Sequence, residues 1–176
     1  LFFPASSPLA SLLLSFATFG AGFVMRPLGA VLIGNMADRR GRKAALTLTI
    51  GLMTAGTALL AFTPSYASIG VTATALVVVG RLLQGLSAGG EVGAASALLM
   101  ESTGKHRRCF AVSWQGASQG AAALLGALTG AAVSALLSPE ALQSWGWRVP
   151  FMLGLLIAPV GIYIRRHLEE TQTENT

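Results

Sequence analysis

The apolar stretch 71–100 contains two charged side chains, Arg81 and Glu91, and one amide side chain, Gln84. If this stretch is an α-helix, Gln84 and Glu91 lie on nearly the same face, and Arg81 lies about 60° away. Arg81 and Glu91 are then about 15 Å apart along the helix axis, too far for a direct ion pair. A guanidinium group in such a place can bind a carboxylate through two parallel hydrogen bonds, and a carboxyl group can take up a proton. Partners on neighbouring helices would explain these side chains as well, and the sequence leaves both interpretations open.

A second polar pair, Gln115 and Gln119, lies one helical turn apart in a later apolar stretch. The two amides could offer neutral hydrogen bonds to a bound substrate. Hydrogen bonding between helices explains them equally well.

The sequence offers little for enzymatic chemistry. It has one cysteine, Cys109, and its two histidines, His106 and His167, lie beside charged residues without a second ligand at metal-site spacing. A His-Glu-x-x-His string is absent, and no aspartate lies within an apolar stretch. We therefore expect no catalytic residues, no metal and no cofactor.

The elements that must position these side chains are apolar segments long enough to cross a membrane, which takes about 20 residues. They are residues 9–33, 44–62, 71–100, 110–137 and 149–164. The chain is only 11% charged, whereas soluble domains carry about 25% charged residues. The sequence therefore predicts an all-α membrane protein, a polytopic helical bundle. Arg26 lies near the predicted inner end of the first segment, and we expect its long side chain to reach the membrane interface.

Positive charge is concentrated in particular loops. A net charge of +5 would suggest nucleic acid as the partner of a soluble protein. Here the basic residues gather in loops 34–43 and 101–109 and in the C-terminal end from residue 165, while the intervening loops are almost free of them. Basic loops stay in the cytoplasm. We therefore expect the C-terminal end inside, the N-terminal end outside, and no nucleic acid.

The loop 34–43 reads Gly-Asn-Met-Ala-Asp-Arg-Arg-Gly-Arg-Lys, and membrane anchoring by positive charge needs neither its aspartate nor its glycines. Asp38 lies four residues before Arg42 and can pair with it. Gly34 allows close approach of another helix, and Gly41 allows a tight reversal. Glu101 is a further predicted partner of Arg42 or of the arginines in the next basic loop. The arrangement suits a charge latch that closes one side of the bundle.

Glycines recur at four-residue spacing within the predicted helices. They are Gly85, Gly89 and Gly93, Gly116 with Gly120, and Gly126 with Gly130. Small residues at this spacing let helix backbones approach closely in lipid. The pattern fits a rigid packed bundle, and it also fits helix faces that slide past one another.

The loop 34–43 resembles the signature loop between the second and third helices of major facilitator superfamily transporters, Gly-x-x-x-Asp-Arg-x-Gly-Arg-Arg/Lys. Met-Arg-Pro-Leu-Gly at 25–29, Gly-Arg-Leu-Leu-Gln-Gly at 80–85 with Gly-Glu at 90–91, and Trp-Gly-Trp-Arg-Val-Pro-Phe at 145–151 resemble its metabolite:proton symporter branch. Residues 113–119 are most similar to citrate–proton symporters within it. The resemblance implies that the chain holds helices two to six, a partial N-terminal half of a twelve-helix fold without its first helix and C-terminal half. One departure is Arg108-Cys109, where many relatives have Arg-Gly.

This resemblance implies proton-coupled symport of an organic carboxylate such as citrate by alternating access, with H⁺ as the coupling ion, across the inner membrane of a bacterial-type cell. The alternatives are symport of a zwitterionic osmolyte or another small metabolite (proline, betaine, shikimate), or a truncated membrane protein that does not transport. The implied substrate-binding residues are Arg81, Gln84, Gln115 and Gln119, with Glu91 in proton coupling. The implied cytoplasmic gate residues are Gly34, Asp38, Arg39, Gly41, Arg42, Glu101, Arg107 and Arg108.

Overall fold

The computed structural model describes residues 2–3, 7–156, 158–161 and 163. Its four long helices are α1 (Pro8–Arg40), α2 (Arg42–Phe62), α4 (Val71–Glu101) and α5 (Arg108–Leu136). Shorter elements are α3 (Tyr66–Ile69), α6 (Pro139–Ser144), α7 (Val149–Gly154), and the 3-10 turns η1 (Lys105–Arg107) and η2 (Gly146–Arg148). Each long helix is long and apolar enough to cross a membrane, and the four overlap the predicted segments 9–33, 44–62, 71–100 and 110–137. In the predicted fifth, 149–164, α7 is followed by helical residues 158–161, and residues 157, 162 and 164 lie outside the described chain.

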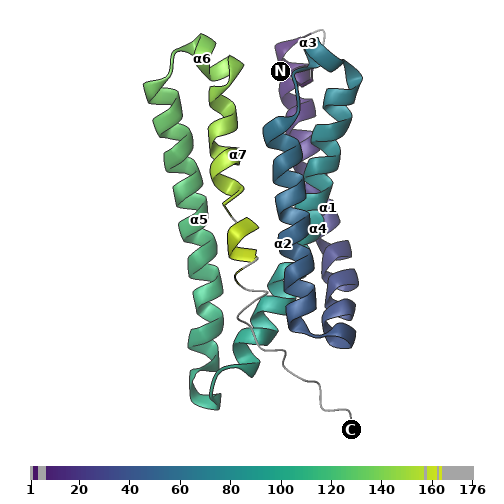
Figure 1. Ribbon diagram of the computed structural model, residues 1–176, viewed down its shortest axis with the longest axis vertical. Coiled ribbons are helices and arrows are strands. Elements are labelled where there is room, and N and C mark those ends of the chain that lie inside the picture. Colours follow the sequence, from purple (N-terminus) through teal and green to yellow (C-terminus); the bar gives the residue numbers. More distant parts are fainter. Residues whose placement is uncertain (1, 4–6, 157, 162, 164–176) are drawn as a thin grey trace.

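Helices α1, α2 and α4 pack side by side as a three-helix core, and α5 and α7 lie to one side of it (Figure 1). The buried cluster is formed by Ile33, Ala37, Ala45, Leu46 and Ala94. Helix α5 contacts α4 and α7 but has no buried residue. The turn at residue 41 and the segment 102–107 lie at the same end of the bundle, which we call the basic end.

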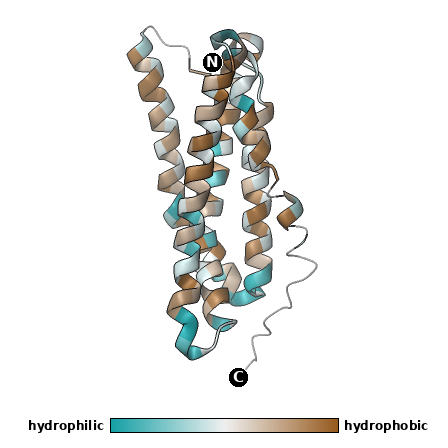
Figure 2. Ribbon diagram, turned by 90° about the vertical axis from the view of Figure 1, so that its left-hand side faces the viewer, coloured by the Kyte–Doolittle hydropathy of each residue, from teal (hydrophilic) through white to brown (hydrophobic). Residues whose placement is uncertain are grey.

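Large apolar side chains cover the outside of the helices. Val24, Val31 and Leu136 are 77%, 71% and 82% exposed. Hydrophobic residues run along most of each helix, and hydrophilic residues gather at the basic end (Figure 2). Such a surface suits lipid rather than water. The chain is a multi-pass membrane protein.

Glycines bring the backbones of α1 and α4 into direct contact. A Cβ atom added at Gly85 would lie 2.0 Å from the carbonyl oxygen of Gly22, and one at Gly89 would lie 2.0 Å from that of Arg26. The close approach predicted from glycine spacing is therefore confirmed at Gly85 and Gly89. Within the described residues, an added Cβ would meet nothing within 4 Å at the other predicted positions. Those positions are Gly93, Gly116, Gly120, Gly126 and Gly130.

The predicted loop 34–43 is mostly helical. Helix α1 continues to Arg40, and α2 begins at Arg42, so Gly41 alone separates them. Its φ of 91° is a conformation that glycine adopts readily, and its N–H donates to the carbonyl of Ala37 at 3.1 Å. The helix continues past the apolar stretch because polarity does not end a helix, and arginines in the last turn favour its dipole. The tight reversal predicted at Gly41 is confirmed.

Candidate functional site

Arg81 is held in place by Gln84 of α4, whose amide is bound in turn by α2. Its Nη1 donates to Gln84 Oε1 at 3.2 Å, and Gln84 Nε2 donates to Thr57 Oγ1 of α2 at 3.0 Å. The guanidinium carbon also lies 5.5 Å from the centre of the Phe19 ring of α1, a favourable cation–π contact. Among the described residues, Arg81 has no carboxylate partner. Its positive charge is therefore oriented but not neutralised.

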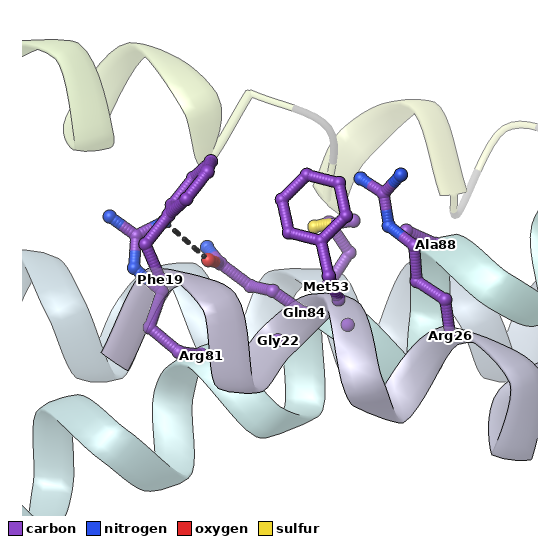
Figure 3. A pocket seen from close by; sticks show the side chains of 9 residues that line it. Phe19, Gly22, Arg26, Met53, Arg81, Gln84 and Ala88 are labelled. Atoms are coloured by element: carbon purple, nitrogen blue, oxygen red, sulfur yellow. Dashed lines mark hydrogen bonds between the residues drawn. The ribbon is translucent and has the colours of Figure 1, made fainter. Parts of the chain in front are cut away.

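An open cavity of about 240 Å³ lies beside this group (Figure 3). Its lining residues are Phe19, Gly22, Phe23, Arg26, Met53, Arg81, Gln84, Gly85 and Ala88. The cavity thus brings together Arg81 and Gln84, two of the four predicted substrate-binding residues. The α1 glycine at position 22 allows α1 to lie directly against α4 here, since its added Cβ would be 3.1 Å from the Arg81 carbonyl oxygen.

Arg26 lines the same cavity, a position that the sequence did not predict for it. Helix α1 continues from Arg26 to Arg40, about 21 Å farther along the axis, so Arg26 lies in the middle of the helix rather than near its end. Its guanidinium carbon lies 4.1 Å from the centre of the Phe23 ring. The spacing of Arg26 to nearby glycines could have indicated that it lies near α4. Arg26 follows Gly22 by four residues and precedes Gly29 by three, and both glycines face α4.

Glu91 does not line the cavity. Its side chain is exposed, and it forms no hydrogen bond or ion pair within the described part of the chain. Arg81 and Glu91 do not pair, as their spacing along the helix predicted. The structure therefore separates the predicted proton-coupling residue from the predicted substrate-binding arginine.

Gln115 joins α5 to α4 instead of facing the cavity. Its Oε1 accepts from Ser96 Oγ at 2.5 Å, and its Nε2 donates to the Val92 carbonyl at 3.4 Å. Interhelical hydrogen bonding, one of the two explanations for this residue, is thus observed. Gln119 is exposed, does not line the cavity and makes no hydrogen bond to any described residue.

Arg42 links three helices at the basic end. Its Nη1 lies 2.5 Å from Asp38 Oδ1 of α1, and its Nη2 lies 3.2 Å from Glu101 Oε1 of α4. The predicted local pair and the predicted Arg42–Glu101 pair are both present. Arg39, Arg107 and Arg108 form no ion pair within the described chain, and Arg108 Nε donates to the Thr103 carbonyl at 3.5 Å. Gly34 has no described neighbour within 4 Å of an added Cβ, so the helix contact expected there is not seen.

Arg148 is a structural residue that the sequence alone did not single out. Its Nε donates to the Ala61 carbonyl at 3.0 Å, its Nη2 to the Thr63 carbonyl at 3.3 Å, and its Nη1 to the Ser144 carbonyl at 2.9 Å. The last carbonyls of an α-helix lack intrahelical partners. Arg148 therefore caps the end of α2 and ties it to α6.

Gly-Ala-Ser-Gln-Gly at 116–120 has the letters of the nucleophile elbow of serine hydrolases. An elbow requires a sharp turn between a strand and a helix, whereas these residues lie within α5. Ser118 Oγ donates to the Gln115 carbonyl at 2.8 Å in the same helix. The string is therefore not a catalytic serine site.

Comparison with known proteins agrees with this architecture. The family described as sugar (and other) transporter matches residues 4–173. The chain is 50% identical over 171 residues to the citrate-proton symporter of Klebsiella pneumoniae, covering 97% of this chain and 38% of that protein. It is 47% identical to the citrate-proton symporter of Salmonella typhi, over 97% of this chain and 39% of that protein. It is 38% identical to the alpha-ketoglutarate permease of Escherichia coli K12, over 100% of this chain and 41% of that protein.

The chain thus spans about two fifths of the length of the curated relatives it matches. No solved structure matches it significantly. The apolar helices, the arginine-lined cavity between α1 and α4, and the ion pairs around Arg42 occur in a chain almost wholly covered by one transporter family. The chain belongs to the sugar (and other) transporter family of the major facilitator superfamily.

Proposed function

We propose that the protein containing this sequence is a proton-coupled symporter of an organic carboxylate such as citrate. The observation that carries the proposal is Arg81, which faces an open cavity, is oriented by Gln84 and has no carboxylate partner among the described residues. A charge within the membrane usually faces a cavity or a partner. A substrate carboxylate would supply the partner by accepting from the guanidinium edge.

Two of the relatives reported above are citrate-proton symporters that share about half of their aligned residues with this chain. This supports citrate as the first substrate to test and H⁺ as the coupling ion. Glu91 is our candidate for proton coupling because it is an ionisable residue of α4 without a described partner. We keep Gln119 as a candidate for substrate contact because its exposed amide forms no hydrogen bond to any described residue.

Transport would follow alternating access, in which two halves of a transporter rock around a site near the middle of the membrane. The positive charge of the loops supports a basic end in the cytoplasm of a bacterial-type cell, with the N-terminal end outside and the C-terminal end inside. The C-terminal end from residue 165 lies outside the described residues. At the basic end, Asp38, Arg42 and Glu101 fasten α1, α2 and α4 together. We assign them to a cytoplasmic latch with Gly34, Arg39, Gly41, Arg107 and Arg108.

There are two competing possibilities. The protein could be a symporter of a zwitterion, or it could be a membrane protein that does not transport. A zwitterionic substrate would also place a carboxylate at Arg81, but it would bring a cation into a cavity that is already positive. A protein with only one of the two helical halves could not carry out alternating access, which requires the halves to move against each other. Uptake by the complete protein separates all three possibilities.

The test is uptake of radiolabelled citrate, proline and betaine by proteoliposomes that contain the complete protein and carry an imposed pH gradient. We expect citrate accumulation that an ionophore abolishes. Gradient-driven uptake of betaine or proline, but of no carboxylate, would replace this proposal with zwitterion symport. No gradient-driven uptake of either class would reject symport altogether.

A further inference from the structure

The cavity beside Arg81 contains a second guanidinium group. Arg26 of α1 and Arg81 of α4 both line it. Gly22 lies against the Arg81 carbonyl, and Arg26 is four residues farther along α1, about 6 Å along the axis. The Arg26 carbonyl in turn lies against Gly89, which is about 12 Å beyond Arg81 along α4. The two arginines therefore sit between about one and two helical turns apart in depth. In Figure 3 they occupy opposite ends of the cavity, with Met53 between them.

Neither charge is neutralised within the described part of the chain. Arg81 bonds to the neutral amide of Gln84, and Arg26 lies over the Phe23 ring. The lining contains no aspartate or glutamate. Two positive charges face one cavity within membrane-spanning helices, where charge is costly unless it finds a partner.

The aromatic rings make these guanidinium groups suitable for ligand binding. A ring that contacts the face of a guanidinium leaves the N–H groups at its edge available as donors. Phe19 lies close to Arg81 and Phe23 to Arg26, at 5.5 and 4.1 Å from the guanidinium carbons. Both polar atoms of the Gln84 side-chain amide already have a partner: Oε1 accepts from Arg81, and Nε2 donates to Thr57. The arginine N–H groups are thus the strongest donors left in the cavity.

We infer that this cavity binds an anion with at least two carboxylates, one at Arg26 and one at Arg81. The inference rests on the proposed carboxylate function and narrows it to di- and tricarboxylates. A monocarboxylate or a zwitterion would leave one arginine without a partner, so the same pair that attracts a polycarboxylate discriminates against them. Arg26 is then a binding residue and not an interfacial anchor.

Equilibrium binding tests this without any gradient. The complete protein, purified in detergent at neutral pH, is titrated calorimetrically with citrate, succinate, acetate and glycine betaine. We expect citrate and succinate to bind at least about tenfold more tightly than acetate and betaine, as loss of one charged hydrogen-bonding partner predicts. The Arg26→Gln variant should bind citrate and succinate about ten- to a hundredfold more weakly while acetate binding changes little.

Arg26→Lys should recover part of the affinity for citrate and succinate, because lysine restores the positive charge but not the paired N–H donors of the guanidinium group. Arg40→Gln, at the end of the same helix and outside the cavity, should bind like the wild type. Equal affinity of the wild type for acetate and succinate would overturn the inference, even if Arg26→Gln did not fold. Unchanged citrate binding by a folded Arg26→Gln protein would also overturn it. Carboxylate binding without gradient-driven uptake would instead reject only symport, so the two proposals fail separately.

Discussion

Arg42 and Glu101, 59 residues apart in the sequence, meet at the basic end of the bundle, with Arg42 Nη2 3.2 Å from Glu101 Oε1. The pair joins the first residue of α2 to the last residue of α4. Because Arg42 also binds Asp38 of α1, one guanidinium fixes three helix ends. Partly exposed pairs contribute little to stability, so this arrangement matters more for the relative positions of the helices than for the folding free energy.

Glu101→Gln tests that role. We expect the free energy of unfolding to change by less than about 1 kcal/mol, because the pair is partly exposed. Citrate uptake should nevertheless fall severalfold, since the latch no longer holds α4 to α2. Thermal unfolding in detergent and proteoliposome uptake measure the two effects.

Glu140→Gln is the matched control for this variant. Glu140 lies on α6 at the opposite end of the bundle, and hydrogen bonds with its own backbone and with Ser138 lower the pKa of its carboxyl group. It is therefore charged at neutral pH, and removing this charge should leave uptake unchanged because Glu140 lies outside the predicted latch. Wild-type uptake by Glu101→Gln would show that the pair is not a latch.

Gln84→Glu tests how Arg81 is used. A carboxylate at this position would pair with Arg81 in place of the neutral amide and would repel a substrate carboxylate. We expect citrate uptake to fall at least about tenfold, the effect of one strong charged hydrogen bond, with the amount of protein in the membrane unchanged. Gln143→Glu, on the exposed face of α6, introduces the same charge away from the cavity and should transport normally. Full activity of Gln84→Glu would exclude Arg81 as the carboxylate-binding group.

Arg81→Gln provides the complementary measurement. Loss of the guanidinium should reduce carboxylate uptake far more than it reduces surface expression, because the cavity keeps its shape while the charge is removed. Uptake of radiolabelled citrate and immunodetection of surface protein are compared in the same cells. Parallel losses of uptake and expression would mean that Arg81 serves assembly through Gln84 and Thr57.

Gly85→Ala tests the contact between α1 and α4. Its new methyl group would lie against the Gly22 carbonyl at a distance that real atoms do not tolerate, and overpacking of this kind costs about 1–3 kcal/mol. Gly93→Ala, two turns farther along the same helix, meets no described atom within 4 Å and should unfold at the wild-type temperature or above it. The two melting curves are recorded in detergent. Equal melting temperatures would contradict the tight α1–α4 contact.

Arg148→Gln tests the cap on α2. The substitution removes donors to the carbonyls of Ala61 and Thr63, and hydrogen bonds from a charged group contribute about 1.5–3 kcal/mol each. We expect a lower melting temperature that Arg148→Lys restores only in part, because an ammonium group cannot reproduce the fork. Lys105→Gln removes a charge from the η1 turn and should have little effect. A wild-type melting temperature for Arg148→Gln would show that the cap does not stabilise the protein.

Some features followed from local sequence. Runs of about 20 apolar residues allow little except membrane-spanning helices, so the all-α fold and its four long apolar helices were predictable. The pairing of Asp38 with Arg42 is a contact between residues four apart, and glycine at position 41 marked the reversal. The sequence also identified Arg81 and Gln84 as candidate site residues, because charged and amide side chains are rare and costly inside such runs.

Other features depended on which helix lies beside which. The sequence showed Arg26 only as a charge near the end of an apolar run, because hydropathy marks contact with lipid and not the end of a helix. Gln115 was equally consistent with a substrate contact and a helix contact until Ser96 and Val92 were placed beside it.

The sequence by itself determined the family, the membrane-spanning helices and the residues that carry charge into them. The tertiary structure decided that Arg26 and Arg81 share one cavity, that Glu91 lies outside it, and that Glu101 pairs with Arg42. The physical reason is that hydropathy and local spacing act along one helix. The depth and rotation of α1 against α4 are instead set by backbone contact at glycines on both helices.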